Sequence, residues 1–363
     1  MTDSPTLAIP PMQADIHRQP QVLADLLARK DDIARFAAQS LRPGNGSRAW
    51  VFGSGDGWFA ARAALTGSEA GRAASGLDFT LNVAPRLGAD DRALAISMSG
   101  NVDRTLEGAQ LAMASGATVA ILTNEGGGRL GALGVNRFSL GIPDIAPFLC
   151  GTSSYTATLA VLQLAFPTAW PGFANSLAAV LPALPDLINR ADAFGKDVAQ
   201  RTGSRISGAR FLGAGASVAT ADYAAAKCVE VTKIPAWSDD IEEFAHRQYW
   251  SMQLSELVVL LPGDAATAAY AEATADALAD LDVVTLAREP QGVSVPSATM
   301  RLALPGAADT AGITQAIALQ LLAYHLGFAS GTDPNKRDHL RSDAARFAVS
   351  RKLTRRSLLG TGQ

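Results

Sequence analysis

The stretch AWVFGSGDG, from Ala49 to Gly57, decides how this chain folds. It is followed by a run of helix-forming residues that extends to Leu65. A short apolar run that ends in Gly-x-Gly and passes into a helix is typical of the first unit of a parallel α/β sheet. Such a turn points backbone N–H groups and the positive end of a helix dipole at one spot, which suits an anion. We therefore expect Gly53, Gly55 and Gly57 to border a ligand site, although a tight turn without a ligand fits the same residues.

The alternation of strand-like and helix-like runs continues beyond this stretch and then starts again. ALAIS and TVAILT predict further strands around the helical run VDRTLEGAQLAMA. A second Gly-rich turn, FLGAGAS, follows 160 residues after the first, with Gly213 in the place of Gly53. The strand-like runs ELVVLL and DVVTLA follow it, and a helix around Gln315 to Leu326 closes the series. This repetition predicts two related α/β halves, each with a mainly parallel sheet flanked by helices.

The remaining segments predict the domain boundaries. Apolar residues recur at helical spacing from Pro20 to Ala38, and the stretch from Pro171 to Ala199 is rich in Leu, Ala and Pro, which suits a connector. We expect an N-terminal arm and helix over residues 1–39, a first α/β domain over 40–190, a second over 191–345 and a basic tail over 346–363.

The composition excludes several classes of protein. Of 363 residues, 48% are hydrophobic and 18% charged, and the net charge of −3 leaves no excess of basic residues for binding nucleic acid. The two cysteines of the chain supply neither a disulfide framework nor a zinc cluster. Three of the four histidines, His17, His325 and His339, have no clustered acids or thiols that could complete a metal site. No run is long and apolar enough to cross a membrane. We expect a cytoplasmic protein with a small-molecule partner and no metal or organic cofactor.

A second polar loop follows the next predicted strand. Ile96-Ser97-Met98-Ser99-Gly100-Asn101 leads into a helix near Val102. Hydroxyls and free amides at the carboxyl end of a parallel strand can converge on one phosphate. The alternative is that Ser99 only caps the helix.

Further polar residues could contribute to the same site. Gly151-Thr152-Ser153 opens an apolar helix that runs to about Phe166, although alone it is an ordinary helix start. In the second half, Glu230 lies in a helix of small and apolar residues, and an acidic and aromatic segment that contains His246 follows. A carboxylate and an imidazole in one cleft can divide proton transfer and ring opening of a sugar between them. Spacing alone favours the alternative that Glu230 is a solvated helix residue and His246 a surface residue.

Together these motifs resemble the double-SIS (sugar isomerase) proteins, which include the isomerase half of glucosamine-6-phosphate synthase and related phosphosugar isomerases and deaminases. GSGDGWFAA is similar to the family's first Gly-rich turn, ISMSGNVDRT to its I-S-x-S-G-E-T phosphate loop and LCGTSSYTATLAVL to the start of its V-A-S-T-K-A helix. The segment from FLGAG to the His246 region overlays the second turn, the catalytic helix and the E-x-x-H segment without a gap. The resemblance implies two SIS domains, each a flavodoxin-like three-layer sandwich.

The resemblance also implies roles for particular residues. Glu230 would move a proton between C1 and C2 of the sugar, and His246, preceded by Glu243, would open the ring from the partner subunit of a homodimer. The substrate would be held by Gly53, Gly55, Asp56, Gly57, Ser97, Met98, Ser99, Gly100, Val102, Gly151, Thr152, Ser153 and Arg341. No glutaminase domain is expected, because the two lobes use the whole length of the chain.

Three departures from the family pattern affect the predicted site. Asp56 and Gly57 replace a pair of hydroxyl residues, so that a carboxylate lies where it would repel a phosphate unless it turns away. Val102 replaces the threonine of the phosphate loop. The C-terminal segment lacks the family's lysine at the expected place, because Lys336 lies a few residues early and the guanidinium of Arg341 forms no Schiff base.

These observations leave two functions open. The first is a phosphosugar isomerase or an amino-sugar-phosphate deaminase that transfers a proton between C1 and C2. The alternative is a catalytically diverged SIS protein that binds a carbohydrate derivative or regulates a partner. Its ligand could be a sugar without a phosphate, whose amine or hydroxyl would suit Asp56.

Overall fold

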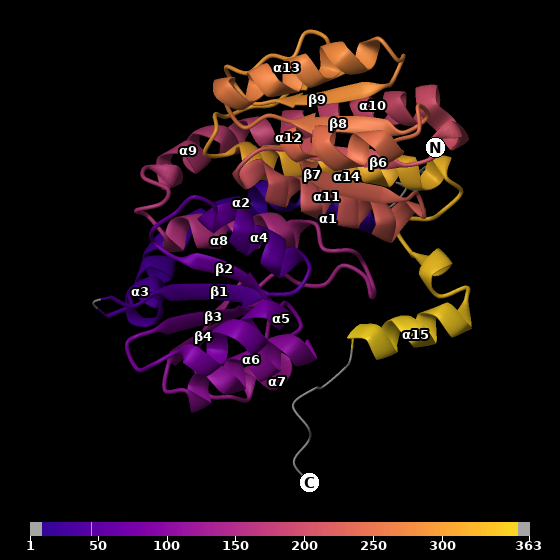
Figure 1. Cartoon of the computed structure of the whole chain (residues 1–363). Coiled ribbons are helices and arrows are strands. Elements are labelled where there is room, and N and C mark those ends of the chain that lie inside the picture. Colours follow the sequence, from indigo (N-terminus) through magenta and orange to yellow (C-terminus); the bar gives the residue numbers. More distant parts are fainter. Residues whose placement is uncertain (1–8, 45, 355–363) are drawn as a thin grey trace, which may run out of the picture.

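A computed structural model of the chain describes residues 9–44 and 46–354. Residues 1–8, at the start of the expected N-terminal arm, and residues 355–363, at the end of the expected basic tail, lie outside the described residues. The described chain forms two lobes, each built on a five-stranded sheet (Figure 1).

The first lobe follows the alternation that the sequence predicts. Its elements are β1 (Ala49–Gly53), α4 (Asp56–Leu65), β2 (Arg72–Ser75), α5 (Gly76–Asp78), a π-helix (Phe79–Val83), a 3-10 turn (Ala84–Arg86), β3 (Arg92–Ile96), α6 (Asp103–Ala114), β4 (Thr118–Thr123), α7 (Gly128–Gly131), β5 (Asn136–Ser139) and α8 (Ser153–Ala165).

The second lobe repeats this order, including the π-helix after its second strand. Its elements are β6 (Ala209–Gly213), α11 (Ala216–Thr232), β7 (Ala236–Asp240), α12 (Ile241–Glu243), a π-helix (Phe244–Gln248), a 3-10 turn (Tyr249–Ser251), β8 (Leu257–Leu261), α13 (Ala265–Ala279), β9 (Thr285–Glu289), β10 (Met300–Ala303) and α14 (Ala311–Ala329).

Both sheets are parallel and have the same topology. The strand order is β2-β1-β3-β4-β5 in the first lobe and β7-β6-β8-β9-β10 in the second. The central strands are largely buried and mostly apolar, as in LVVLL of β8. The expectation of two α/β domains with flanking helices is therefore confirmed.

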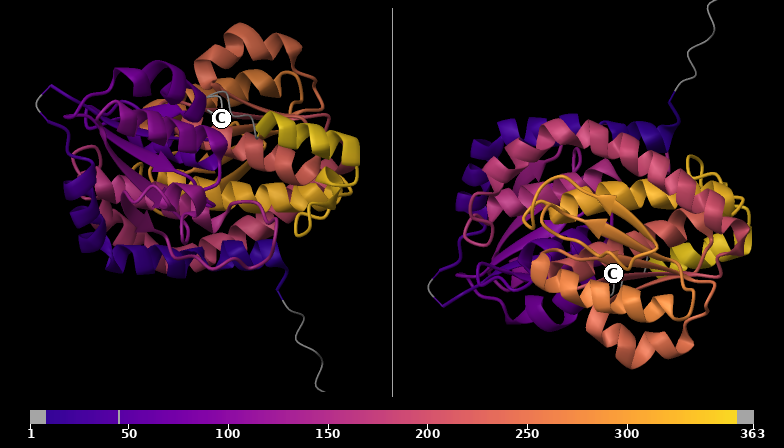
Figure 2. Two further views of the ribbon diagram at one scale, coloured as in Figure 1. Left: turned by 90° about the horizontal axis from the view of Figure 1, so that it is seen from below. Right: turned by 90° about the horizontal axis from the view of Figure 1, so that it is seen from above.

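The two lobes share a central layer of helices. One face of the first sheet and one face of the second pack against α4, α8, α10 (Leu184–Thr202), α11 and α14, while α6 and α13 cover the outer faces. Figure 2 shows the same layers from below and from above. Arg62 of α4 forms an ion pair with Asp222 of α11, and these residues are 160 positions apart, the offset of the repeat. The helices α4 and α11 therefore meet about a pseudo-twofold axis.

The segments outside the repeat differ from the expectation in detail. The single helix predicted from Pro20 to Ala38 is wrong, because two helices occupy that stretch, α2 (Gln19–Ala28) and α3 (Lys30–Ser40). A further helix, α1 (Pro11–His17), precedes them. The expected connector contains α9 (Phe173–Val180) and α10, so the boundary drawn at residue 190 falls inside a continuous helix.

The C-terminal helix α15 (Ala344–Thr354) has no buried residue and projects from the second lobe beside the first (Figure 1). Within residues 9–44 and 46–354, no helix combines the length and the apolar character that a membrane span requires.

Candidate functional site

The site lies at the carboxyl end of the first sheet. The helices that follow β1 and β3 leave the sheet on opposite faces, so the ends of these two neighbouring strands form a crevice, which is where open α/β sheets bind ligands. A cavity of about 330 Å³ opens there. Its walls come from the ends of β1, β3 and β4, from the loop before α8 and from α1: Asp15, Arg18, Asp56, Met98, Asn124, Ile142, Asp144, Ile145, Ala146, Phe148, Leu149, Cys150, Gly151, Ser153 and Ser154.

The first Gly-rich turn brings β1, α4 and β3 close together. A Cβ atom on Gly53 or Gly57 would lie 2.8 Å from an atom of Ile96, so both positions need glycine for packing. Gly55 has φ +56, a left-handed conformation that suits glycine. Asp56, the first residue of α4, turns its side chain into the cavity.

The Ser97 loop leaves several polar groups without partners. Ser97 is buried, and its hydroxyl has no hydrogen-bond partner within the described residues. The backbone N–H groups of Met98, Ser99 and Val102 also donate no hydrogen bond within the part of the chain described. Helix α6 begins after Val102 without a side-chain cap. These free donors at a helix N-terminus form the kind of cradle that binds an anion.

Two neighbours fix the shape of this loop. Gly100 has φ +64, and a Cβ atom there would lie 1.7 Å from the carbonyl oxygen of Gly127, so no other residue fits. The side chain of Asn101 donates to the carbonyl of Ser99 and accepts from the backbone N–H of Arg129. The loop is therefore preorganised.

A chain of alternating charges lies beside the cavity. The ammonium of Lys227, which is only 2% exposed, lies 3.0 Å from Oδ2 of Asp56 and 2.9 Å from Oε2 of Glu230. Arg337 also contacts Oε2 of Glu230, at 3.2 Å. The charge of Asp56 is thus compensated by Lys227, which removes the repulsion that a bare carboxylate would exert on a bound phosphate.

Burial and charge shift the pKa values of this cluster. Burial raises the pKa of Asp56, and the neighbouring Lys227 opposes that shift. Burial lowers the pKa of Lys227, but the charges of Asp56 and Glu230 outweigh burial, so its pKa is raised and it stays an ammonium. Burial raises the pKa of Cys150, in the cavity wall, to about 12, so this residue is a thiol at neutral pH.

The C-terminal segment closes one side of the site. Arg337 adopts φ +51 and is buried, and it donates to the carbonyl oxygen of Phe148 through Nε at 2.8 Å and through Nη2. The guanidinium of Arg341 lies 3.7 Å from the centre of the Phe148 ring, which lines the cavity. Lys336 is 70% exposed and pairs with Asp333. The cation that reaches Glu230 from this segment is therefore Arg337, which the sequence analysis did not identify.

Thr152 and Ser153 use their hydroxyl groups within the protein. Thr152 is fully buried and donates to Asp15, and Ser153 donates to Asp15 through its hydroxyl at 2.9 Å and through its backbone N–H at 3.0 Å. Arg18 donates to the Ser153 hydroxyl and pairs with Asp15. These contacts fasten α1 to the start of α8, so Asp15 and Arg18 are two more residues of the site that the sequence analysis did not identify.

The structure does not bring every predicted residue to the cavity. Glu243 and His246 are exposed on the segment after β7, and the His246 ring lies 3.2 Å from Glu242. Glu230 does not line the cavity: it pairs with Lys227, which in turn pairs with Asp56, and its side chain is 35% exposed. Of the residues named from the sequence, Asp56, Met98, Gly151 and Ser153 line the cavity.

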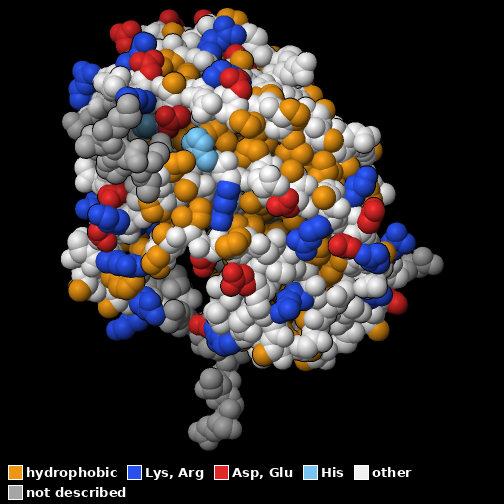
Figure 3. Space-filling view, turned by 180° about the vertical axis from the view of Figure 1, so that it is seen from behind, with side chains coloured by type: hydrophobic (Ala, Val, Ile, Leu, Met, Phe, Trp, Pro, Cys, Tyr) orange, Lys and Arg blue, Asp and Glu red, His pale blue; other side chains and the backbone are white. Residues whose placement is uncertain are grey.

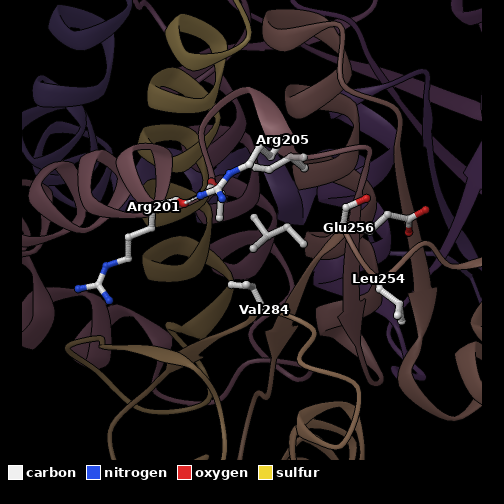
Figure 4. Close-up of a pocket in the computed structure, with 9 residues that line it drawn as sticks. Arg201, Arg205, Leu254, Glu256 and Val284 are labelled. Atoms are coloured by element: carbon white, nitrogen blue, oxygen red, sulfur yellow. Dashed lines mark hydrogen bonds between the residues drawn. The ribbon is translucent and has the colours of Figure 1, made fainter.

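A second cavity lies at the opposite end of the other sheet. It measures about 280 Å³ and is lined mainly by apolar groups, with Arg201 and Arg205 at its side (Figure 4). Leu257, in its wall, is the first residue of β8, so this cavity is at the amino end of the strands. That end of a parallel sheet is not where ligands bind, and we place the functional site at the first cavity.

The space-filling view from behind shows a deep hollow in the lower part of the surface, with acidic side chains at its rim (Figure 3). Among the described residues, no group of three or more His, Cys, Asp or Glu is arranged to hold a metal ion.

Comparison with known families identifies the class of domain. Residues 71–167 match the family model described as the SIS domain. A comparison with curated protein sequences finds no match.

Solved structures extend this likeness over both lobes. The C-terminal domain of glucosamine-fructose-6-phosphate aminotransferase from Francisella tularensis has a TM-score of 0.72 at 16% identity and covers 92% of this chain and 99% of its own. Tagatose-6-phosphate ketose/aldose isomerase from Escherichia coli has a TM-score of 0.73 at 20% identity, and the match covers 93% of this chain and 97% of the isomerase chain. Glucosamine-6-phosphate deaminase from Thermotoga maritima has a TM-score of 0.66 at 14% identity, and the match covers 88% of this chain and 97% of the deaminase chain. The resemblance to the double-SIS proteins is therefore confirmed at the level of the fold.

Proposed function

We propose that this chain is a sugar-phosphate isomerase or an amino-sugar-phosphate deaminase whose reaction moves a proton between C1 and C2 of the sugar. The observation that carries the proposal is that the Ser97 loop and the carboxylate of Asp56 border one cavity. The loop offers a buried hydroxyl and free N–H groups to a phosphate, and the cluster of Asp56, Lys227 and Glu230 offers acid–base groups to the other end of the ligand.

Each group has a role in this proposal. The phosphate binds at Ser97, Ser99 and the N-terminus of α6, near Met98, which lines the cavity. We infer that the C1–C2 end of the sugar extends past Asp56 to Glu230, which does not line the cavity and whose Oε1 atom accepts no hydrogen bond within the described residues. Glu230 then transfers the proton between C1 and C2. His246 opens the sugar ring from the partner subunit of a homodimer, because it is exposed and is not among the residues that line the cavity in its own chain. The similar structures named for a ketose/aldose isomerase and for a deaminase support this class of substrate.

A second candidate is a sugar-phosphate-binding protein without turnover. The C-terminal segment favours it, because Lys336 points to solvent and pairs with Asp333, so no lysine of this segment contacts Glu230.

A ligand screen followed by an assay separates the two candidates. Thermal unfolding is measured with glucose, fructose, tagatose and glucosamine 6-phosphates and with the same sugars without phosphate, because a specific ligand stabilises the native state. We expect one sugar phosphate to raise the melting temperature and its free sugar to leave it unchanged.

Aldose–ketose conversion or ammonia release is then measured for that ligand, with Glu230→Gln as the matched variant. Turnover by the wild type that Glu230→Gln abolishes supports the enzyme. Stabilisation without turnover supports the binding protein, and stabilisation by free sugars alone contradicts both.

A further inference from the structure

We propose that Asp56 is a second catalytic acid–base group, which exchanges the protons on the oxygen atoms of the substrate while Glu230 moves the proton on carbon. This inference rests on the proposed isomerase function. It concerns a position at which the resemblance predicts only binding, and at which this chain has a carboxylate instead of a hydroxyl group.

The position of Asp56 is the first argument. Of the charged chain Asp56–Lys227–Glu230–Arg337, only Asp56 lines the cavity. Its Oδ2 atom accepts from Lys227, whereas Oδ1 has no hydrogen-bond partner among the described residues. A Cβ atom on Gly151 would lie 2.5 Å from Oδ2, so glycine at that position makes the room that this carboxylate occupies. Oδ1 is therefore available to a hydroxyl group of a bound sugar.

The charges around Asp56 allow it to gain and lose a proton. When Asp56 is neutral, the buried Lys227 is still paired with Glu230 at 2.9 Å, so no buried ammonium is left without a counter-ion. Glu230 contacts two cations, Lys227 and Arg337, and neutralising it would leave Arg337 without its carboxylate partner. Protonation of Asp56 therefore costs less free energy than protonation of Glu230.

The other ionisable groups around Asp56 come from several elements. They are Glu230, Lys227 and Tyr223 of α11, Arg337 of the C-terminal segment, Cys150 before α8, Tyr155 of α8, and Asp15, Arg18 and Asp144, which share the cavity wall. The burial that raises the pKa of Asp56 increases the fraction of its neutral form near the pH at which enzymes work.

The proposed reaction balances without a cofactor. In the open-chain aldose, Glu230 removes the proton from C2, the electron pair of that bond forms the C1=C2 double bond, and O1 takes a proton from neutral Asp56. In the second step, ionised Asp56 takes the proton of the O2 hydroxyl, C2=O2 forms, and the C1=C2 pair takes the proton of Glu230 at C1. Both carboxyl groups return to their starting states.

The test uses Asp56→Asn in the full-length chain, because the amide keeps the size and one acceptor oxygen but cannot exchange a proton. Asp186→Asn is the matched control, since Asp186 is a 71% exposed carboxylate that pairs with one cation, Arg190, and lies outside the cavity wall. Turnover and the dissociation constant are measured with whichever of fructose, tagatose or glucosamine 6-phosphate the wild type converts. We expect kcat of Asp56→Asn to fall about 100-fold or more, with Kd within about threefold, and Asp186→Asn to match the wild type.

Three results would overturn the inference. Asp56→Asn with kcat near that of the wild type leaves the isomerase intact and refutes the role of Asp56 alone. A loss confined to Kd makes Asp56 a binding residue only. A wild type that converts none of the three sugar phosphates refutes the proposed function and this inference with it. If Asp56→Asn does not fold, Asp56→Ser is used instead, because it restores a hydroxyl group of the kind that the family has in this turn. Its kcat and Kd are measured and interpreted in the same way.

Discussion

The two halves share one topology but differ in the loop after β3 and its counterpart after β8. In the first half, α6 begins after Val102 without a side-chain cap, and the Ser97 hydroxyl and neighbouring N–H groups have no partner among the described residues. In the second half, Asp264 accepts from the N–H of Thr267 at 2.8 Å, and the Thr267 hydroxyl accepts from the N–H groups of Asp264 and Gly263. One loop thus has donors to offer an anion, and the other has its own carboxylate in that place.

The offset of 160 residues extends the comparison to the charged cluster. The counterpart of Asp56 is Ala216, and the counterpart of Lys227 is Gly67. The Asp56–Lys227 ion pair therefore has no equivalent across the pseudo-twofold axis. A duplicated fold has two crevices, one at the end of each sheet. In this chain the free donors of the Ser97 loop and the Asp56–Lys227 ion pair both lie at the first crevice, so we expect one ligand per chain.

The largest effect is expected from Gly100→Ala, compared with Gly263→Ala in the other loop. At Gly100 the new Cβ would meet the Gly127 carbonyl at 1.7 Å with φ +64, whereas at Gly263 the nearest atom would be 3.2 Å away and φ lies outside the left-handed region. We expect Gly100→Ala to lose about 3 kcal/mol of unfolding free energy and all sugar-phosphate binding. Gly263→Ala is expected to lose about 1 kcal/mol or less and to keep binding. Urea unfolding and calorimetric titration measure both, and equal losses in the two loops would contradict the comparison.

The next effect is expected from Lys227→Met, which leaves Asp56 and Glu230 without the ammonium between them. We expect a loss of about 2 kcal/mol at pH 8, below the full value for a buried pair because Asp56 and Glu230 are 24% and 35% exposed. The loss should shrink as the pH falls. Without Lys227 the pKa of Asp56 in the folded protein rises further, so the folded state gains stability relative to the unfolded state as Asp56 takes up its proton.

The control for this variant is Lys336→Met, because Lys336 is an exposed lysine whose pair with Asp333 lies at the surface. It should change the unfolding free energy by less than about 0.5 kcal/mol. Denaturant unfolding at several pH values tests both, and a Lys227→Met loss that is the same at pH 5 and pH 8 would refute the assignment of Asp56 as the titrating partner.

A smaller effect is expected from exchanging the caps of the two helices. Asp264→Ala removes the cap of α13 and should cost about 1 kcal/mol of stability with no change in ligand affinity. Val102→Asp places a carboxylate at the open N-terminus of α6 and should weaken sugar-phosphate binding about tenfold or more, since it occupies the donors and repels the phosphate. If Asp264→Ala weakens binding and Val102→Asp does not, the anion site is in the second half.

The smallest effect concerns the two cysteines, one in each half. Burial raises the pKa of Cys150 to about 12 and that of Cys228 to about 11. We expect neither thiol to react with iodoacetamide at pH 8 in the native protein and both to react in denaturant. Rapid labelling of Cys150 alone would show that the wall of the first cavity opens to solvent.

Much of the fold could be predicted from the sequence because both halves carry the same signals. The six apolar runs are strands β1, β3, β4, β6, β8 and β9. The edge strands β2, β5, β7 and β10 were not predicted, because each pairs on one side only and therefore carries polar residues, as in NRFS and AWSDD. The break at Arg29 in the N-terminal helices was missed because the apolar spacing continues through it.

The site was less predictable, since it depends on contacts between distant segments. Lys227 precedes Glu230 by three residues and so shares its helix face, a signal that could have found it. No local sequence pattern indicates that Arg337 adopts a left-handed conformation and contacts Glu230, which is 107 residues away. Likewise, no local pattern indicates that Asp15 binds the hydroxyls of Thr152 and Ser153. The roles assigned to Glu230, Glu243 and His246 stay predictions.

The most direct test is a crystal structure of the chain with the sugar phosphate that raises its melting temperature most. We predict that the phosphate lies at the Ser97 loop and the N-terminus of α6, with the C1–C2 end of the sugar within hydrogen-bond distance of Oδ1 of Asp56. A phosphate on the loop of Asp264, or beside Arg201 and Arg205 in the second cavity, would contradict it.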